Sequence, residues 1–286
     1  MEVLISILFG IVEGVTEWLP VSSTGHMIVL NELIPLSVGS NPEGFYSMFE
    51  VVIQLGAILA VVLLYFGKLW PFGRKNNNNP LGDSSLKSYI KKDIFILWIK
   101  VLVSCIPAAV IGLLFDDLFE ELFYNYTTVA IMLILVGILF IVVENMNKNK
   151  EFRVDNYMDI TYRDALIIGL FQVVAAILPG TSRSGATIVG ALLIGISRGA
   201  AAEYTFFLAI PVMFGASLLK IVKYGLSFTG YELLVLGVGT VVSFIVSIIV
   251  IKLLLGYIKK HDFKPFGIYR IVLGGLIFAS ALAGII

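Results

Sequence analysis

The stretch EGVTEWLPVSSTGH, residues 13–26, decides how the rest of this sequence is interpreted. It places two carboxylates, two serines, two threonines and a histidine inside an otherwise apolar N-terminal region. A second stretch, PGTSRSG at residues 179–185, adds an arginine and further hydroxyls in similarly apolar surroundings. Polar side chains are costly inside a membrane, so two such clusters indicate a functional site if the chain spans a bilayer.

The composition of the chain is that of an integral membrane protein. Hydrophobic residues make up 58% and charged residues only 14% of the 286 residues, and the mean hydropathy is +0.96. Several apolar runs approach membrane-spanning length, which predicts an all-α polytopic membrane protein in a lipid bilayer. The formal net charge is zero, so we expect no nucleic-acid partner. We treat residues 1–286 as a single membrane domain.

A helix, a proline and a hydroxyl-rich turn follow one another at the start of the chain. Residues 1–19 are helical in character, Pro20 blocks continuation of the helix, and the sequence SSTG supplies capping and turn residues. The next apolar piece, residues 26–34, is too short to cross a bilayer, which takes about 20 residues. We therefore interpret this pair as a re-entrant hairpin, enclosed at membrane depth by protein or a water-filled cavity.

The second half of the chain repeats this plan. A predicted helix over residues 164–178 stops at Pro179, and the turn PGTSRSG and a short apolar piece, residues 186–196, follow. Aligning Pro20 with Pro179 pairs four further positions, the last after one inserted residue: Glu13 with Gln172, Glu17 with Ala176, Ser23 with Ser182, and Gly25 with Gly185.

Six other apolar segments are long enough to span a membrane: residues 47–66, 93–114, 126–143, 200–222, 232–255 and 265–286. The basic loop 67–92 is predicted to be cytoplasmic, and the acidic loop 115–125 suits the outside. Three spans in each half make residues 1–143 and 164–286 an inverted-topology repeat, an architecture that places sites near the midplane at the repeat interface. If each hairpin were instead two short crossings, the ends of each half would still lie on the same sides of the membrane, so that topology stays open.

The first candidate groups are two carboxylates. Glu13 and Glu17 are spaced i, i+4 and lie on one helix face. Two carboxylates in a low dielectric repel each other unless a cation or a shared proton lies between them. We expect a divalent cation, Mg²⁺ or Ca²⁺, bound by this pair. A shared proton, with one glutamate acting as acid or base, is the competing interpretation, and a pair that only caps or hydrates a helix end is a third.

The two turns are candidate phosphate sites, because hydroxyls and free N–H groups at a helix N-terminus bind anions of that size. In the first turn Ser23 is the candidate nucleophile and His26 a candidate proton donor or acceptor. The alternative is a turn that only caps its helix, with a structural histidine. The candidate phosphate-binding residues are Ser22, Thr24, Gly25, Gly180, Thr181, Ser182, Arg183 and Ser184.

Arg183 supplies what the first turn lacks, a fixed positive charge. Its planar fork suits phosphate oxygens, although a structural ion pair with Glu13, Glu17 or Glu203 is the alternative. Two anion-binding turns with carboxylates, a histidine and an arginine suit phosphoryl transfer, which depends on positioning and charge neutralisation. The competing function is a secondary transporter or a flippase of an anionic lipid or small anion, which uses inverted repeats and midplane half-helix ends.

At these residues the chain resembles the undecaprenyl-diphosphate phosphatase family, the BacA type linked to bacitracin resistance. EGVTEWLPVSSTGH and PGTSRSGATI match its two signature regions almost word for word, and FEVVIQLGAILAVV at residues 49–62 matches another familiar stretch. The resemblance covers essentially the whole chain. It implies inverted repeats with two re-entrant helix pairs.

The resemblance also implies an activity and a place. The expected reaction removes the terminal phosphate from a polyprenyl diphosphate lipid, undecaprenyl diphosphate, and yields the lipid carrier for cell-wall precursors. A divalent cation is implied, as is a site that opens to the outer face of the bacterial cytoplasmic membrane. The positions that match the family are Glu13, Glu17, Ser23, His26 and Arg183. The choice between a phosphoserine and direct water attack stays open, as do a homodimer, the prenyl chain length and flipping of the product.

Overall fold

The computed structural model describes residues 1–73, 77, 79–82, 87–123 and 125–283. Within these residues the chain forms α-helices, two short 3₁₀ helices and no β-strand. The α-helices are α1 (Glu2–Thr16), α2 (Ser23–Leu33), α3 (Pro42–Val52), α4 (Gln54–Leu64), α5 (Phe66–Leu69), α6 (Lys92–Phe123), α7 (Tyr126–Asn147), α8 (Tyr162–Ile177), α9 (Arg183–Leu193), α10 (Arg198–Tyr224), α11 (Gly230–Ile258) and α12 (Lys264–Leu282).

Six helical segments of the described chain are long and apolar enough to cross a membrane. They are α3 with α4 (Pro42–Leu64), the part Lys92–Phe115 of α6, α7, α10, α11 and α12. This confirms the prediction of an all-α polytopic membrane protein with about six membrane-spanning helices. The predicted span 47–66 begins earlier than expected, at Pro42, because the Asn41 side chain caps α3 and Pro42 fits its first turn.

Four helices next to the polar turns are too short to span. α1 has 15 residues, α8 has 16, and α2 and α9 have 11 each. At 1.5 Å per residue, all of them fall short of the roughly 30 Å of a hydrocarbon core. α1 ends at Thr16, earlier than the predicted end at residue 19. The reason is Pro20, which lacks an N–H and disfavours helical conformation in the residue before it.

The C-terminal end of α6 also differs from the prediction. The acidic stretch that was expected to form a loop continues α6 as far as Phe123. Residues 113–123 read LLFDDLFEELF, with apolar residues recurring every three or four positions and no Gly or Pro to stop the helix. The rings of Phe115, Phe119 and Phe123 follow one another along this extension, with centroids 5.8 and 6.2 Å apart.

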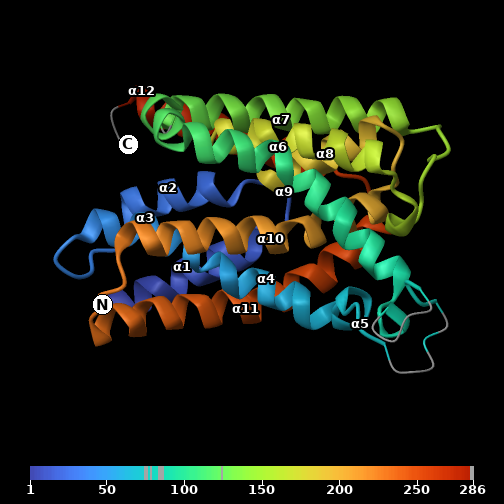
Figure 1. The fold of residues 1–286 in the computed structure, drawn as a ribbon. Helices are drawn as coiled ribbons and strands as arrows, with labels where there is room; N and C mark the ends of the chain where they lie inside the picture. The colour runs from blue at the N-terminus through green and yellow to red at the C-terminus, as the bar shows by residue number, and fades with distance from the viewer. Residues whose placement is uncertain (74–76, 78, 83–86, 124, 284–286) are drawn as a thin grey trace.

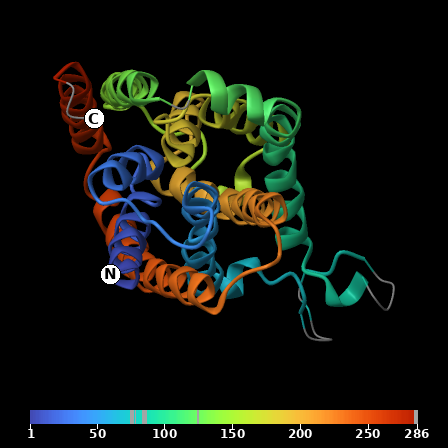
Figure 2. The same cartoon turned by 90° about the vertical axis from the view of Figure 1, so that its left-hand side faces the viewer.

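The helices pack in pairs around α10. α7 lies along α12, α1 along α11, and α8 along α6, while α10 contacts α3, α4, α6 and α9 (Figures 1 and 2). In Figure 1, α1 begins and α12 ends at the same end of the molecule, and the loops before α6 and before α8 lie at the other end. α1 approaches α11 closely, since a Cβ on Gly14 would lie 2.8 Å from the Ser243 carbonyl oxygen.

Trp18 anchors the first turn in the largest buried apolar cluster. Its side chain is fully buried, and its ring meets Phe206 of α10 edge-on at 5.1 Å between centroids. Burying so large a side chain is worth roughly 1.5–3 kcal/mol. The turn that follows α1 is therefore held against α10, the helix that also contacts α9.

Candidate functional site

Both turns contain a capping serine in the same unusual conformation. Ser22 and Ser182 have φ of 75° and 70°, and they are the only non-glycine residues with positive φ in the described part of the chain. The Oγ of each serine accepts a hydrogen bond from the glycine N–H three residues on, at 3.3 Å for Gly25 and 3.1 Å for Gly185. Such backbone strain costs on the order of 1–3 kcal/mol and is concentrated at functional sites.

This geometry changes the alignment of the two halves. Anchoring on the prolines paired Ser23 with Ser182, but the capping conformation pairs Ser22 with Ser182 instead. The inserted residue of the second turn therefore lies before its serine. As a consequence, Ser23 and Arg183 occupy equivalent positions, the first residues of α2 and α9.

Glu17 joins the two turns. Its Oε1 accepts a hydrogen bond from the Arg183 Nη2 at 2.8 Å, and its Oε2 accepts one from the Ser23 Oγ at 2.7 Å. The Ser184 Oγ donates to the backbone carbonyl of Glu17 at 3.2 Å. All four residues are largely buried, so the ion pair lies in a low dielectric, where it is stronger than at a surface. Of the ion pairs considered for Arg183, the structure contains the one with Glu17.

The remaining donors of Arg183 are only partly used. Nη1 donates to the Thr205 carbonyl of α10 at 3.1 Å, and Nε has no hydrogen-bond partner among the described residues. The side chains of α9 and α10 are also joined here, because the Thr187 and Thr205 hydroxyls are hydrogen-bonded at 3.0 Å. A buried arginine with a spare donor can take up an additional acceptor oxygen without losing its anchor.

His26 makes its hydrogen bonds outside this group. Its Nδ1 lies 2.7 Å from the Ser22 carbonyl, its Nε2 lies 2.7 Å from the Tyr269 hydroxyl, and its ring stacks on Tyr269. A carbonyl only accepts, so Nδ1 carries the proton, and in the neutral ring Nε2 accepts from Tyr269. The hydrogen bonds described for His26 reach neither Ser23 nor Glu17, so its role in proton transfer stays a prediction.

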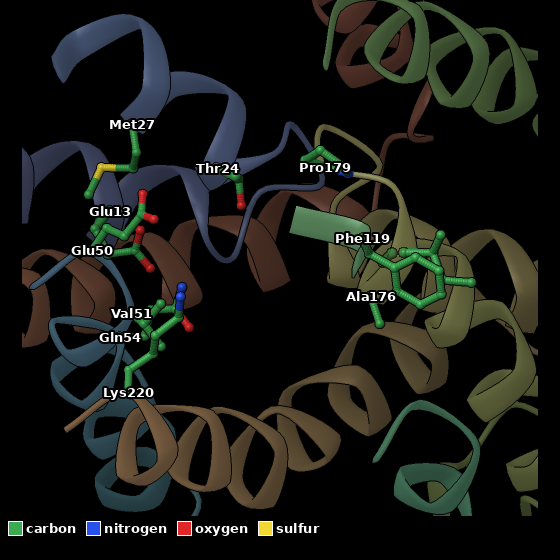
Figure 3. Close-up of a pocket in the computed structure, with 12 residues that line it drawn as sticks. Glu13, Thr24, Met27, Glu50, Val51, Gln54, Phe119, Ala176, Pro179 and Lys220 are labelled. Carbon is green, nitrogen blue, oxygen red and sulfur yellow. The ribbon is translucent and has the colours of Figure 1, made fainter. Parts of the chain in front are cut away.

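Glu13 takes no part in the hydrogen bonds of this ion pair and lines a cavity of about 200 Å³. It is fully buried, and neither carboxylate oxygen has a hydrogen-bond partner in the described structure. Figure 3 shows Glu50 beside it, Thr24 pointing into the same cavity, and Ala176 and Pro179 on the far side. Glu13 is therefore close to Glu50, a residue that the sequence did not single out as a ligand.

The predicted cation pair was Glu13 with Glu17. In the structure the Glu17 carboxylate is already engaged by Arg183 and Ser23. The described residues contain no group of three or more His, Cys, Asp or Glu side chains that could hold a metal ion. The oxygen atoms around the cavity, from Glu13, Glu50 and Gln54, are nevertheless the ligand type that hard divalent cations take.

The other predicted phosphate-binding residues form the second turn and the start of α9. Gly180 has φ of 87°, and a Cβ there would lie 2.6 Å from the Val129 carbonyl oxygen, so only glycine fits. The buried Thr181 hydroxyl has no partner among the described residues. The Ser182 Oγ lies 3.1 Å from the Ser184 Oγ.

Arg270, in the middle of α12, was not predicted from the sequence as a site residue. This fully buried guanidinium donates to the Pro20 carbonyl of the first turn at 3.1 Å and to the Gly180 and Thr181 carbonyls of the second at 2.8 and 2.9 Å. Further bonds of 3.4 Å reach two carbonyls of α7. The available signal was a charged residue in the apolar run FGIYRIVLGG, residues 266–275. Arg270 holds the two turns together.

The fold and the site define a class: a multi-pass α-helical membrane protein with a buried polar centre that two matching turns share. The family model described as bacitracin resistance protein BacA matches residues 6–276, and the chain belongs to this family. This confirms the resemblance carried by the two signature stretches.

The names of similar proteins agree with the family. The chain is 60% identical to an undecaprenyl-diphosphatase of Desulfitobacterium hafniense, over 97% of this chain and 95% of the relative. It is also 60% identical to undecaprenyl-diphosphatase 1 of Clostridium acetobutylicum, over 96% and 95%. An undecaprenyl-diphosphatase of Enterococcus faecalis is 56% identical, over 97% and 96%.

Proposed function

We propose that this protein hydrolyses undecaprenyl diphosphate to undecaprenyl phosphate and inorganic phosphate, and so recycles the lipid carrier for cell-wall synthesis. The observation that carries the proposal is the meeting of Ser23, Glu17 and Arg183 across the two turns. The names of the relatives support the same reaction. A nucleophile, a carboxylate base and a fixed cation within hydrogen-bond distance are the groups that phosphoryl transfer requires.

In this proposal the substrate phosphate replaces Glu17 as the partner of Arg183. Arg183 turns from Glu17 to the phosphate oxygens, and the free N–H groups at the start of α2 and α9 bind further oxygens. Glu17, released from the arginine, is then available to accept the Ser23 proton. The bond that breaks joins the terminal phosphorus to the bridging oxygen, which leaves with the lipid phosphate.

Two routes fit this arrangement. In the first, the Ser23 Oγ attacks the terminal phosphorus, Glu17 accepts its proton, and water later releases inorganic phosphate from the serine. In the second, Ser23 and Glu17 position a water molecule that attacks directly, and Glu17 accepts the water proton. In either route, a proton relay through His26 requires its ring to exchange Tyr269 for a group of the substrate.

A divalent cation fits the wall of the cavity better at Glu13 and Glu50 than at Glu13 and Glu17. Two unpartnered carboxylate oxygens in a fully buried side chain need a cation or a proton to offset their desolvation. Glu50 and Gln54 add oxygen donors from α3 and α4. A bound Mg²⁺ or Ca²⁺ would supply positive charge against the diphosphate.

The proposed topology is an inverted repeat in which α1–α2 and α8–α9 are re-entrant pairs. The packing supports it, because exchanging the two halves turns the pair α1–α11 into the pair α8–α6. The cavity that contains Glu13 is also lined by Phe119 and Lys220, which lie near the C-terminal ends of α6 and α10. In Figure 1 these two helix ends lie at the opposite end of the molecule from the basic loop before α6. If that loop is cytoplasmic, the site opens to the outer face of the cytoplasmic membrane.

The test is phosphate release by the purified protein from undecaprenyl diphosphate with Mg²⁺. We expect multiple turnovers by the unaltered protein and none after the change Glu17→Gln. No release, together with ion-coupled uptake of an anion into liposomes, would contradict the proposal and favour a transporter.

A further inference from the structure

A second cavity, of about 420 Å³, lies between α6, α8 and α10. Its walls are mostly small or apolar: Ala108, Gly112, Ala176, Gly215 and their neighbours leave the space open. A Cβ added to Gly112 or Gly215 would meet no atom within 4 Å. The charged or amide side chains on its lining are Arg183 and Gln172.

Gln172 is the unexplained group in this cavity. Its side chain is 2% exposed, and neither its Nε2 nor its Oε1 has a hydrogen-bond partner in the described structure. Burying an amide without a partner is costly, so such a group indicates a binding role. The amide offers two donor hydrogens to a cavity that Arg183 also lines.

The cavity continues the proposed catalytic site. Ala175 and Ala176 of α8 line both this cavity and the one that contains Glu13. The alignment pairs Ala176 with Glu17 and Gln172 with Glu13. Where the first half has two carboxylates, the second half therefore has open space and a neutral amide, and an anion can approach this side without like-charge repulsion.

We propose that Gln172 is a substrate-binding residue and that this cavity holds the isoprene units next to the diphosphate of the lipid. The Gln172 Nε2 donates to an oxygen of the phosphate that stays on the lipid, beside Arg183. An amphiphilic occupant of this kind suits mostly apolar walls that also carry a guanidinium and an amide, and it satisfies the orphaned donors. The inference rests on the proposed hydrolysis and assigns the position of its leaving group.

The first experiment separates binding from structure by the change Gln172→Leu. In the protein without substrate, replacing an unpartnered buried amide by an apolar group of similar size should leave the thermal stability equal or higher. We expect kcat/KM for undecaprenyl diphosphate to fall about 10- to 100-fold, as for loss of a hydrogen bond to a charged group. The matched control is Ser247→Ala, which removes another buried unpartnered group that lines neither cavity.

The second experiment fills the cavity by the change Gly112→Leu. Its control is Gly237→Leu on α11, an exposed helical glycine that also has no atom within 4 Å of an added Cβ. We expect Gly112→Leu to raise KM about 10-fold with kcat largely kept, and the control to leave both unchanged.

The outcomes distinguish this inference from the proposed function. If the unaltered protein releases no phosphate, the proposed function fails. If it turns over but Gln172→Leu and Gly112→Leu both keep the original kcat/KM, only the inference is overturned, and a lipid acyl chain or water is then the occupant. Should Gln172→Leu fail to give folded protein, Gly112→Leu alone decides.

Discussion

The turn before α2 and the turn before α9 share a backbone but carry different chemical groups. Ser22 and Ser182 cap their helices in the same positive-φ conformation. The next residue is Ser23 in one turn and Arg183 in the other, and the two meet on opposite oxygens of Glu17. In the proposed reaction, this repeated scaffold lets one half supply the nucleophile and base and the other half supply the fixed positive charge.

The helices that lead into the turns extend this division. The first half has Glu13 and Glu17, and the second half has Gln172 and Ala176 at the positions aligned with them. A second pair of carboxylates would repel a diphosphate from both sides. This difference between the halves therefore suits an anionic substrate. Arg270 holds the two turns next to each other, because it donates to a backbone carbonyl of each.

Among changes within the two turns, the largest expected effect comes from removing the positive charge of the second turn. Arg183→Ala should lower kcat/KM on the order of 10³-fold, because the transition-state charge loses its fixed donor. Arg183→Lys should restore little, since an ammonium cannot form the bidentate fork. Phosphate release measures both, with Arg153→Ala, a half-exposed arginine that pairs with Asp164, as the control. A lysine variant with most of the activity would argue against a bidentate clamp.

The next effect comes from the equivalent position of the first turn. Ser23→Ala should lower kcat on the order of 10²-fold or more, because the attacking or water-positioning hydroxyl is lost. Ser6→Ala is the control, because the Ser6 hydroxyl is also buried on this side but donates to the Val235 carbonyl. Near-normal turnover of the Ser23 variant would rule out a serine nucleophile.

A smaller effect tests the cation. Glu13→Gln and Glu50→Gln should each raise the Mg²⁺ concentration for half-maximal turnover about 10-fold, because each removes an oxygen charge from the cavity wall. Excess chelator should stop turnover of the unaltered protein. Glu32→Gln, at the end of α2 and hydrogen-bonded to Tyr126, is the matched control. An unchanged Mg²⁺ requirement in the Glu50 variant would return the assignment to Glu13 and Glu17.

The smallest expected effect is on stability, and it concerns a difference between the N-terminal ends of α1 and α8. No side chain caps α1, whereas Thr161 and Asp164 form a capping box on α8 that Arg153 joins at 2.6 Å. Burial raises the pKa of Asp164, but the hydrogen bonds from Thr161 and Arg153 outweigh it and hold the pKa below its usual value.

A depressed pKa in the folded state contributes stability above the unfolded pKa of about 3.9, and this stability is lost as the pH falls through the folded value. Asp164→Asn should therefore lower the free energy of unfolding by about 1 kcal/mol at pH 7, with turnover kept. The difference from the unaltered protein should shrink below about pH 4. Thermal unfolding at several pH values measures it, and a pH-independent difference would contradict the charge-based explanation.

The sequence predicted the spans and both turns because hydropathy, prolines and hydroxyl runs are local signals. It missed the continuation of α6 to Phe123, where acidic residues suggested a loop but the helical apolar spacing prevailed. The Ser22–Ser182 equivalence was hidden because a positive φ is not visible in residue identities. Arg270 and Glu50 were missed for another reason: their neighbours in the site come from distant parts of the chain.

The central claim, that both turns form one site, is tested most directly by a double-mutant cycle on Ser23→Ala and Arg183→Ala. Phosphate release gives kcat/KM for the two single variants and the double variant. If both residues act on one transition state, the double variant should be about as slow as the slower single variant, a coupling on the order of 10-fold or more. Losses that multiply independently would contradict a shared site.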